Sequence, residues 1–146
     1  EIRRLGRRAA EFEQLIGSRV DGHPLLGLSG VGSLTAARLL AETGDITRFR
    51  SSDAFAMLAG VAPIPASSGE VRRMRLNRHG NRKLNRALYT IAQSQALHHL
   101  PAKAYLARKR TAGKSRPEAL RCLKRQLVRR VFGLMLTGQS AQPMAA

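Results

Sequence analysis

The chain alternates between stretches with helical periodicity and short breaks rich in glycine, proline and serine. In the first stretch, arginine and glutamate separate apolar residues that recur every three or four positions: Ile2, Leu5, Ala9, Phe12 and Ile16. This spacing predicts a helix with one apolar stripe, as at the a and d positions of a coiled coil. The break from Gly17 to Pro24 predicts the end of that helix.

The next forty residues predict short helices joined by a tight glycine turn. A helical turn is expected to end near Leu28, and Gly30 and Gly32 shape the turn after it. A second helix is expected to run from about Ser33 to Gly44, with Ala36, Leu39 and Leu40 on its buried face, and a third to begin at a serine cap at 51 or 52.

Residues 61–81 interrupt the helices. The stretch from Pro63 to Gly69 contains two prolines, two serines and a glycine, and this composition predicts a loop. Residues 71–76 alternate only roughly and predict an extended strand or arm, and residues 77–81 predict a second break.

Three helices are expected after residue 81: 82–101, 102–111 closed by Gly113, and 117 to about 137. Pro117 suits a first helical turn because its missing N–H would have no partner there. The tail 138–146 is expected to fray. The predicted fold class is therefore mainly α: a helix-hairpin-helix, then a Pro/Ser/Gly loop, then a basic helical bundle, with one short extended segment.

The charge is distributed very unevenly. The 146 residues contain 26 basic and 9 acidic side chains, a formal net charge of +17. Residues 1–70 contain eight of each sign, so the excess lies in residues 71–146, where Glu118 is the one acid. A neutral front and a basic back predict that the second half faces a polyanion. Nucleic acid is the favoured partner, with an anionic membrane surface or an acidic protein as alternatives.

Several classes of protein are excluded by what the sequence lacks. Cys122 is the single cysteine, no apolar run reaches 18 residues, and the opening residues lack the charged, apolar and small-residue zones typical of a signal peptide. These features predict a protein of a reducing compartment, with no membrane partner. Zinc, Walker and Rossmann motifs are missing, and a two-metal nuclease would need more acids in the basic half. Because the chain begins on Glu1, it is expected to be a fragment of a longer protein.

Residues 28–36, Leu-Ser-Gly-Val-Gly-Ser-Leu-Thr-Ala, resemble the helix-hairpin-helix motif. Glycines without a Cβ let backbone N–H groups at the start of the next helix approach a phosphate oxygen. Gly30 and Gly32 are therefore candidate phosphate-binding residues. The alternative is a tight turn that only packs one helix on the next.

The second candidate site is the pair Ser67 and Ser68. A serine hydroxyl is a poor nucleophile at neutral pH, so a reactive serine needs a base, a metal or dense positive charge around its target. Positive charge follows these serines within eighteen residues: Arg72, Arg73, Arg75, Arg78, Arg82, Lys83 and Arg86. Spacing alone nevertheless favours the alternative, an ordinary polar turn.

Taken in order, several stretches resemble the C-terminal transposase domain of the insertion-sequence-110 family. The resemblance runs from about Leu25 to Met135, and no single piece of it is decisive. It rests on the following stretches: 25–42, 44–49, 58–63, 67–69, 78–88 and 105–114.

Members of this family are DNA transposases or recombinases with an N-terminal ribonuclease-H-like domain, a coiled-coil connection and this C-terminal domain. The resemblance implies that a serine before glycine joins covalently to DNA, which places the nucleophile at Ser68, with Ser67 as the alternative. Residues 1–23 would end the coiled coil and residues 24–137 would form the transposase domain. Mg²⁺ is expected in the missing N-terminal domain and no metal in this fragment, which is expected to be inactive alone.

The expected partners are DNA, a guide RNA in some members, and further copies of the full-length protein in the bacterial cytoplasm. Alternatives remain: a helix-hairpin-helix module that binds DNA or RNA without chemistry, or a scaffold that assembles through the stripe at 2–16. The residues expected to contact nucleic acid are Gly30, Gly32, Arg72, Arg73, Arg75, Arg78, Arg82 and Lys83.

Overall fold

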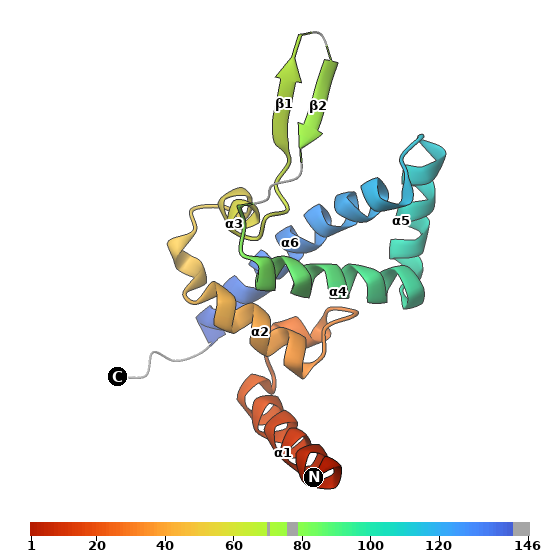
Figure 1. Cartoon of the computed structure of the whole chain (residues 1–146). Helices are drawn as coiled ribbons and strands as arrows, with labels where there is room; N and C mark the ends of the chain where they lie inside the picture. Colours follow the sequence, from red (N-terminus) through yellow and green to blue (C-terminus); the bar gives the residue numbers. More distant parts are fainter. Residues whose placement is uncertain (70, 76–78, 142–146) are drawn as a thin grey trace.

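The computed structural model describes residues 1–69, 71–75 and 79–141 and is mainly helical, which confirms the predicted class (Figure 1). A helix α1 leads into a layer of short elements, and a hairpin separates these from three further helices. In chain order the elements are α1 (Ile2–Val20), η1 (Pro24–Gly27), α2 (Ser33–Thr43), η2 (Ile46–Arg48), α3 (Ser52–Leu58), β1 (Ile64–Ser68), β2 (Val71–Arg75), α4 (Arg82–His98), α5 (Leu100–Thr111) and α6 (Arg116–Ala141).

Local signals in the sequence set several helix ends. Gly44 ends α2 with φ 64°, in the left-handed region that glycine adopts without strain. The hydroxyl of Ser51 accepts a hydrogen bond from the Ala54 N–H at 3.2 Å and caps α3. Both ends agree with the predictions for this region.

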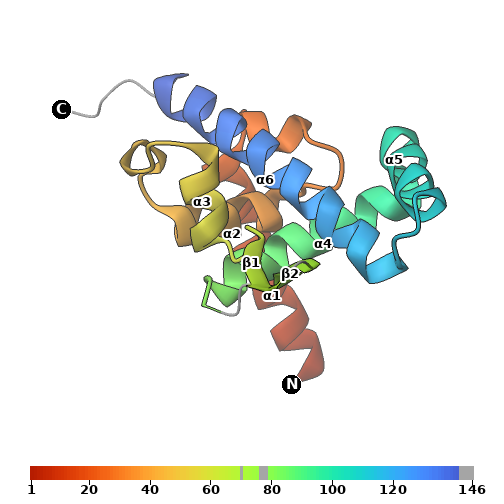
Figure 2. The same cartoon turned by 90° about the horizontal axis from the view of Figure 1, so that it is seen from above.

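The core lies where α4 and α6 cross and where α2, α3 and α5 pack against them (Figure 2). Leu88 and Ile91 of α4 and Val131 of α6 are fully buried. Phe55 of α3 is also buried, and its ring lies 5.9 Å from the ring of Phe132 on α6. Each such side chain contributes about 1.5–3 kcal/mol by leaving water. The apolar faces predicted for these helices therefore pack into one hydrophobic core.

Helix α1 contacts α2 near its C-terminal end and is exposed over residues 1–15. Its predicted apolar stripe faces solvent, with Ile2 87% and Phe12 57% exposed. Helix α1 continues past Gly17 and ends at Val20, which is buried, so its end falls within the predicted break from Gly17 to Pro24. A glycine inside a helix weakens it by about 1 kcal/mol relative to alanine but does not end it.

The loop predicted at 63–69 is in part a strand, whereas the predicted extended segment after it is confirmed as β2. The two strands form an antiparallel hairpin in which Pro65 pairs with Met74. A proline is tolerated because both strands of a two-stranded sheet are edge strands with backbone groups free of pairing on one side. Gly69, with φ 79°, begins the turn. The hairpin projects away from the helices (Figure 1).

The last two helices are longer than predicted. Helix α5 begins at Leu100, with Pro101 in its first turn. The prediction that the tail frays from 138 is wrong for residues 138–141, which belong to α6. Gly138 is buried, and a Cβ there would lie 2.3 Å from Nε2 of His23. Residues 142–146 lie outside the described residues. None of the described helices is both long and apolar enough to cross a membrane.

Candidate nucleic-acid interface

The base of the hairpin is a close backbone contact between two glycines. Gly60 follows α3 and leads toward β1, and Gly80 lies on the return from β2 to α4. A Cβ on Gly80 would lie 2.3 Å from Cα of Gly60 and 2.9 Å from the carbonyl oxygen of Leu58. Real Cβ atoms do not approach so closely. The two chain segments can therefore meet only because residue 80 has no side chain.

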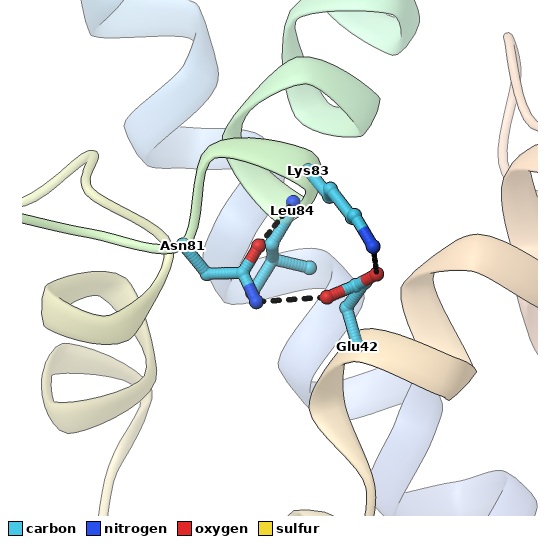
Figure 3. A network of polar contacts seen from close by, with 4 residues as sticks. All are labelled: Glu42, Asn81, Lys83 and Leu84. Carbon is cyan, nitrogen blue, oxygen red and sulfur yellow. Dashed lines mark hydrogen bonds and ion pairs between the residues drawn. The ribbon is translucent and has the colours of Figure 1, made fainter.

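Asn81 joins three elements beside this contact (Figure 3). Its side-chain oxygen accepts from the Leu84 N–H at 2.9 Å and caps α4, and its own N–H donates to the carbonyl oxygen of Leu58 at 2.6 Å. Its side-chain nitrogen donates to Oε2 of Glu42 on α2 at 2.9 Å. The start of α4 is thus tied to α2 and to the end of α3.

The Glu42 carboxylate also forms an ion pair with a residue of α4. Nζ of Lys83 lies 3.4 Å from its Oε1. The hydrogen bond from Asn81, followed by the charge of Lys83, lowers the pKa of Glu42 below its ordinary value, and partial desolvation opposes them. One of the predicted phosphate-binding cations, Lys83, therefore already has an acidic partner within the chain.

Asn85, one turn further along α4, holds the other segment. Its side-chain nitrogen donates to the carbonyl oxygens of Ala59 at 2.9 Å and Gly60 at 3.1 Å. Its side-chain oxygen accepts from Nζ of Lys124 on α6 at 2.7 Å. Burial, and then the charge of Arg121, lower the pKa of Lys124 to about 8. Helices α2, α4 and α6 thus all contribute side chains that fix the hairpin base.

The predicted serines lie at the opposite end of the hairpin from this base. Ser67 and Ser68 are the last two positions of β1, next to the Gly69 turn. In the strand register Ser68 pairs with Val71 and Ser67 pairs with Arg72. The backbone therefore carries both serines at the tip of a projection whose base is fixed by buried and half-buried contacts.

The predicted arginines are divided between the hairpin and the first turns of α4. Arg72, Arg73 and Arg75 belong to β2, and Arg82 and Arg86 are exposed on α4, just beyond the hairpin base. Arg78 lies outside the described residues. The basic residues of β2 thus lie along the hairpin, and those of α4 lie at its base, at the opposite end from the serines.

The glycine turn lies near the other end of α4. Gly30 has φ 86°, and a Cβ there would lie 3.1 Å from the carbonyl oxygen of Ile91 and 3.2 Å from Cβ of Ser94. Gly30 is thus needed for packing. Gly32, the N-cap of α2, is exposed and has open space where its Cβ would lie. At 1.5 Å rise per residue, Ile91 is roughly 15 Å along α4 from Asn81, so the turn and the hairpin base are separate places.

Asn81, Asn85 and Lys124 were missing from the predicted site. Asn81 could have been found, since an asparagine directly before a helical pattern is a typical N-cap. Asn85 and Lys124 contact partners 25 to 39 positions away in the chain, and no local pattern identifies such pairs. Among the residues that the structure describes, no group of three or more His, Cys, Asp or Glu side chains could hold a metal ion.

The family model and the similar proteins found by comparison all belong to insertion elements. The model of the transposase family IS116/IS110/IS902 matches residues 22–107. An uncharacterized 43.6 kDa protein of insertion element IS110 from Streptomyces coelicolor is 35% identical over 90% of this chain and 33% of its own length. A 42 kDa protein of IS900 from Mycobacterium paratuberculosis is 30% identical over 92% of this chain and 35% of its own length. The chain thus spans about a third of the length of these relatives.

Proposed function

Because the chain belongs to the IS116/IS110/IS902 family of transposases, we propose that it is the DNA-binding and strand-joining C-terminal part of a transposase. Its nucleophile is a serine at the hairpin tip, Ser68, with Ser67 as the alternative. The observation that carries this proposal is the position of both serines at the end of a projecting strand, with the hairpin base tied to three helices.

The proposed step is a transesterification. The serine oxygen forms a bond to the phosphorus of a DNA phosphodiester, the bond from phosphorus to one DNA oxygen breaks, and the chain becomes covalently linked to one strand. The hydroxyl proton leaves the serine and the departing DNA oxygen takes up a proton. The phosphoserine ester keeps the energy of the broken bond for a later joining step.

Charge is the second support for the proposal. The hydroxyl needs help because its own pKa is far above neutral pH, and cations stabilise the negative charge that gathers on the phosphate in the transition state. In the register, Arg72 pairs with Ser67 and Arg73 with Ala66, so basic residues accompany the serines along the hairpin. We propose that Arg72, Arg73, Arg75, Arg78, Arg82 and Lys83 bind the phosphates around the attacked one.

The rest of the reaction is proposed for a longer protein. From the family resemblance we propose that Mg²⁺ acts in a ribonuclease-H-like domain of that longer protein. Without that domain we expect no strand transfer by this chain. A guide RNA and assembly of several copies in the bacterial cytoplasm are further parts of the proposal. A phosphate contact at Gly32 of the proposed helix-hairpin-helix would hold DNA at a second place.

The test is covalent trapping in the full-length protein. Ser68→Ala is expected to abolish both recombination of a plasmid substrate and the protein–DNA adduct that survives denaturing electrophoresis. Ser67→Ala is expected to keep both, and the reverse pattern would move the nucleophile by one position. Ser18→Ala on α1 is the control, because its exposed hydroxyl donates to the carbonyl oxygen of Leu15 in the same helix and lies far from the hairpin along the chain.

If both hairpin variants recombined DNA normally, the catalytic part of the proposal would be wrong. A chain that still bound DNA in that case would be the non-catalytic binding module that the sequence left open. A Ser67→Ala and Ser68→Ala double variant with intact binding but no adduct would separate binding from chemistry within one protein.

A further inference from the structure

A second concentration of positive charge lies away from the hairpin, at the turn between α5 and α6. We define the basic turn by five cations within nine residues: Arg108, Lys109, Arg110, Lys114 and Arg116. Lys109 is half-buried and the other four are exposed. None of these five belongs to the residues predicted to bind nucleic acid, so the proposed function leaves their charge unexplained.

These cations form no ion pair within the described part of the chain. The three ion pairs found there involve Arg4, Lys83 and Arg129. The nearby acid, Glu118, is engaged by the backbone. It accepts from the Ser115 N–H at 2.7 Å, while the Ser115 hydroxyl accepts from the Glu118 N–H at 3.4 Å, which is a capping box. Most of the charge of the basic turn is therefore left for a partner outside the chain.

Helix stability explains only part of this cluster. Arg108, Lys109 and Arg110 lie in the last turn of α5, where positive charge is favourable to the helix dipole. Lys114 and Arg116 lie just before and at the start of α6, where the same dipole makes positive charge unfavourable. Lys114 and Arg116 thus reduce the stability of α6, and an external anion would account for them.

The turn presents its charges from a fixed backbone. Gly113 has φ 88°, its N–H donates to the carbonyl oxygen of Arg110 at 3.0 Å, and the Lys114 N–H donates to that of Lys109 at 3.1 Å. The Tyr105 ring lies 5.9 Å from the Arg108 guanidinium and 5.4 Å from Nζ of Lys109. Ordered cations lose less conformational freedom when a ligand binds.

The basic turn and the hairpin lie on the same side of the molecule. In Figure 1 both lie away from the end where α1 begins, and Figure 2, seen from above, shows the hairpin near the middle of the molecule and the turn toward its right-hand edge. We propose that the basic turn is a second contact for the phosphate backbone of the duplex DNA on which the hairpin acts. This inference rests on the proposed function, because it takes its ligand from that function.

Such a contact positions DNA without reading its sequence. Each phosphate that a lysine or arginine neutralises releases counterions, so binding weakens with salt by a slope of about 0.9 for each neutralised phosphate. A duplex held at both the hairpin and the basic turn has a steeper salt dependence than one held at the hairpin alone. The number of phosphates that the turn neutralises can therefore be measured without a structure of the complex.

The experiment uses the 146-residue chain and a 30-base-pair DNA duplex, followed by fluorescence anisotropy from 50 to 200 mM salt. The test variant replaces Lys109, Arg110, Lys114 and Arg116 by glutamine. The control replaces Arg3, Arg4, Arg7 and Arg8 of α1, which removes the same charge from the opposite end of the molecule. We expect the slope of log affinity against log salt concentration to become shallower by about 0.9 for each phosphate that the test variant no longer neutralises. In the control, the change in this slope should be less than half of the change in the test variant.

A smaller variant guards against loss of folding. Lys114→Gln with Arg116→Gln removes two charges that oppose the dipole of α6, so it should melt at or above the wild-type temperature. Its slope should still fall by about 1 to 2. Equal slopes in the test and control variants would overturn the inference while leaving the proposed function intact.

Three further outcomes would test the proposed contact between the basic turn and duplex DNA. If the wild-type chain does not bind the duplex, the inference and the DNA-binding part of the proposed function both fail. An effect of the test variant on a structured RNA hairpin alone, or on vesicles with anionic lipid alone, would overturn the assignment to duplex DNA. Normal duplex binding by Ser68→Ala, together with weak binding by the test variant, would show that the turn acts independently of the nucleophile.

Discussion

Nζ of Lys124 on α6 donates a hydrogen bond of 2.7 Å to Oδ1 of Asn85 on α4. Because Asn85 uses that oxygen for Lys124, its side-chain nitrogen is oriented toward the carbonyl oxygens of Ala59 and Gly60. A residue on the last helix thus fixes the amide that holds the start of the hairpin. Lys124 is 8% exposed, which makes its charge costly in the folded chain.

We expect the contribution of Lys124 to stability to depend on pH. Its pKa is about 8 in the folded chain against an ordinary 10.5, so between these values the unfolded chain binds more protons at this site. The free energy of unfolding therefore rises with pH in that window and is insensitive to this group below it. Urea unfolding of wild type and Lys124→Met at pH 7 and at pH 9.5 measures the effect as the change in their difference.

Lys124→Met also leaves Oδ1 of Asn85 without its hydrogen-bond donor. The cost of this lost hydrogen bond in the variant is the same at both pH values. All other titrating groups are the same in the two proteins. The free energy of unfolding of wild type should therefore increase relative to that of Lys124→Met between pH 7 and pH 9.5. No such increase would contradict the lowered pKa of Lys124.

Gly80→Ala is expected to destabilise the chain. The added methyl group would lie 2.3 Å from Cα of Gly60, so two backbone segments must separate, and overpacking of this kind costs about 1–3 kcal/mol. Gly133→Ala is the matched control, since a Cβ at this exposed position of α6 meets nothing within 4 Å. It should stabilise the helix by about 0.5–1 kcal/mol. Opposite signs in thermal melting confirm the glycine contact, and equal signs would refute it.

Asn81 is expected to act as both a helix cap and a bridge to Glu42. Asn81→Ser keeps a capping oxygen and loses the bond to Glu42, whereas Asn81→Ala loses both, so alanine should cost about 1 kcal/mol more. The pKa of Glu42, followed by carbon-13 NMR, should rise in both variants because Asn81 is the main cause of its lowering. An unchanged Glu42 pKa would show that the bridge is absent in solution.

The two glycines of the turn before α2 should respond differently. Gly30→Ala forces a side chain into a left-handed conformation against Ile91, so it should destabilise the chain by about 1–2 kcal/mol. Gly32 has φ −95°, which any residue adopts, and serine is a good N-cap, so Gly32→Ser should keep or raise the stability. If DNA phosphates approach the amides there, Gly32→Ser should still weaken DNA binding, and unaltered affinity would assign the turn to packing alone.

Sequence patterns predicted the helical part of this fold well because its signals are local. The residues whose spacing predicted the inner face of α4, including Leu84, Leu88 and Ile91, are buried. Gly44 and Ser51 end and begin helices as expected. These signals depend on neighbours within one or two helical turns, so the rest of the fold does not alter them.

The predictions were wrong where contacts with residues far away in the chain determine the local structure. Prolines and serines at 63–68 suggested a loop because no local pattern shows that β2 pairs with them. Helix α6 passes its predicted end because Gly138 packs against His23, more than a hundred positions earlier. The same limit applies to the candidate site. The serines and the arginines are predictions from composition and family resemblance, whereas the contacts that fix the hairpin join α2, α4 and α6 in space.

The glycine contact at the hairpin base has a mechanical consequence. A strand of five residues is about 17 Å long, so any change of angle at Gly60 and Gly80 would be amplified at the tip of the hairpin. A rotation of about 10° at these glycines swings the tip by about 3 Å. Misplacement of a reacting group by about 1 Å can already slow catalysis a hundredfold. If the proposed serine nucleophile is correct, side chains at the hairpin base, far from the reacting atoms, would therefore affect where its hydroxyl lies.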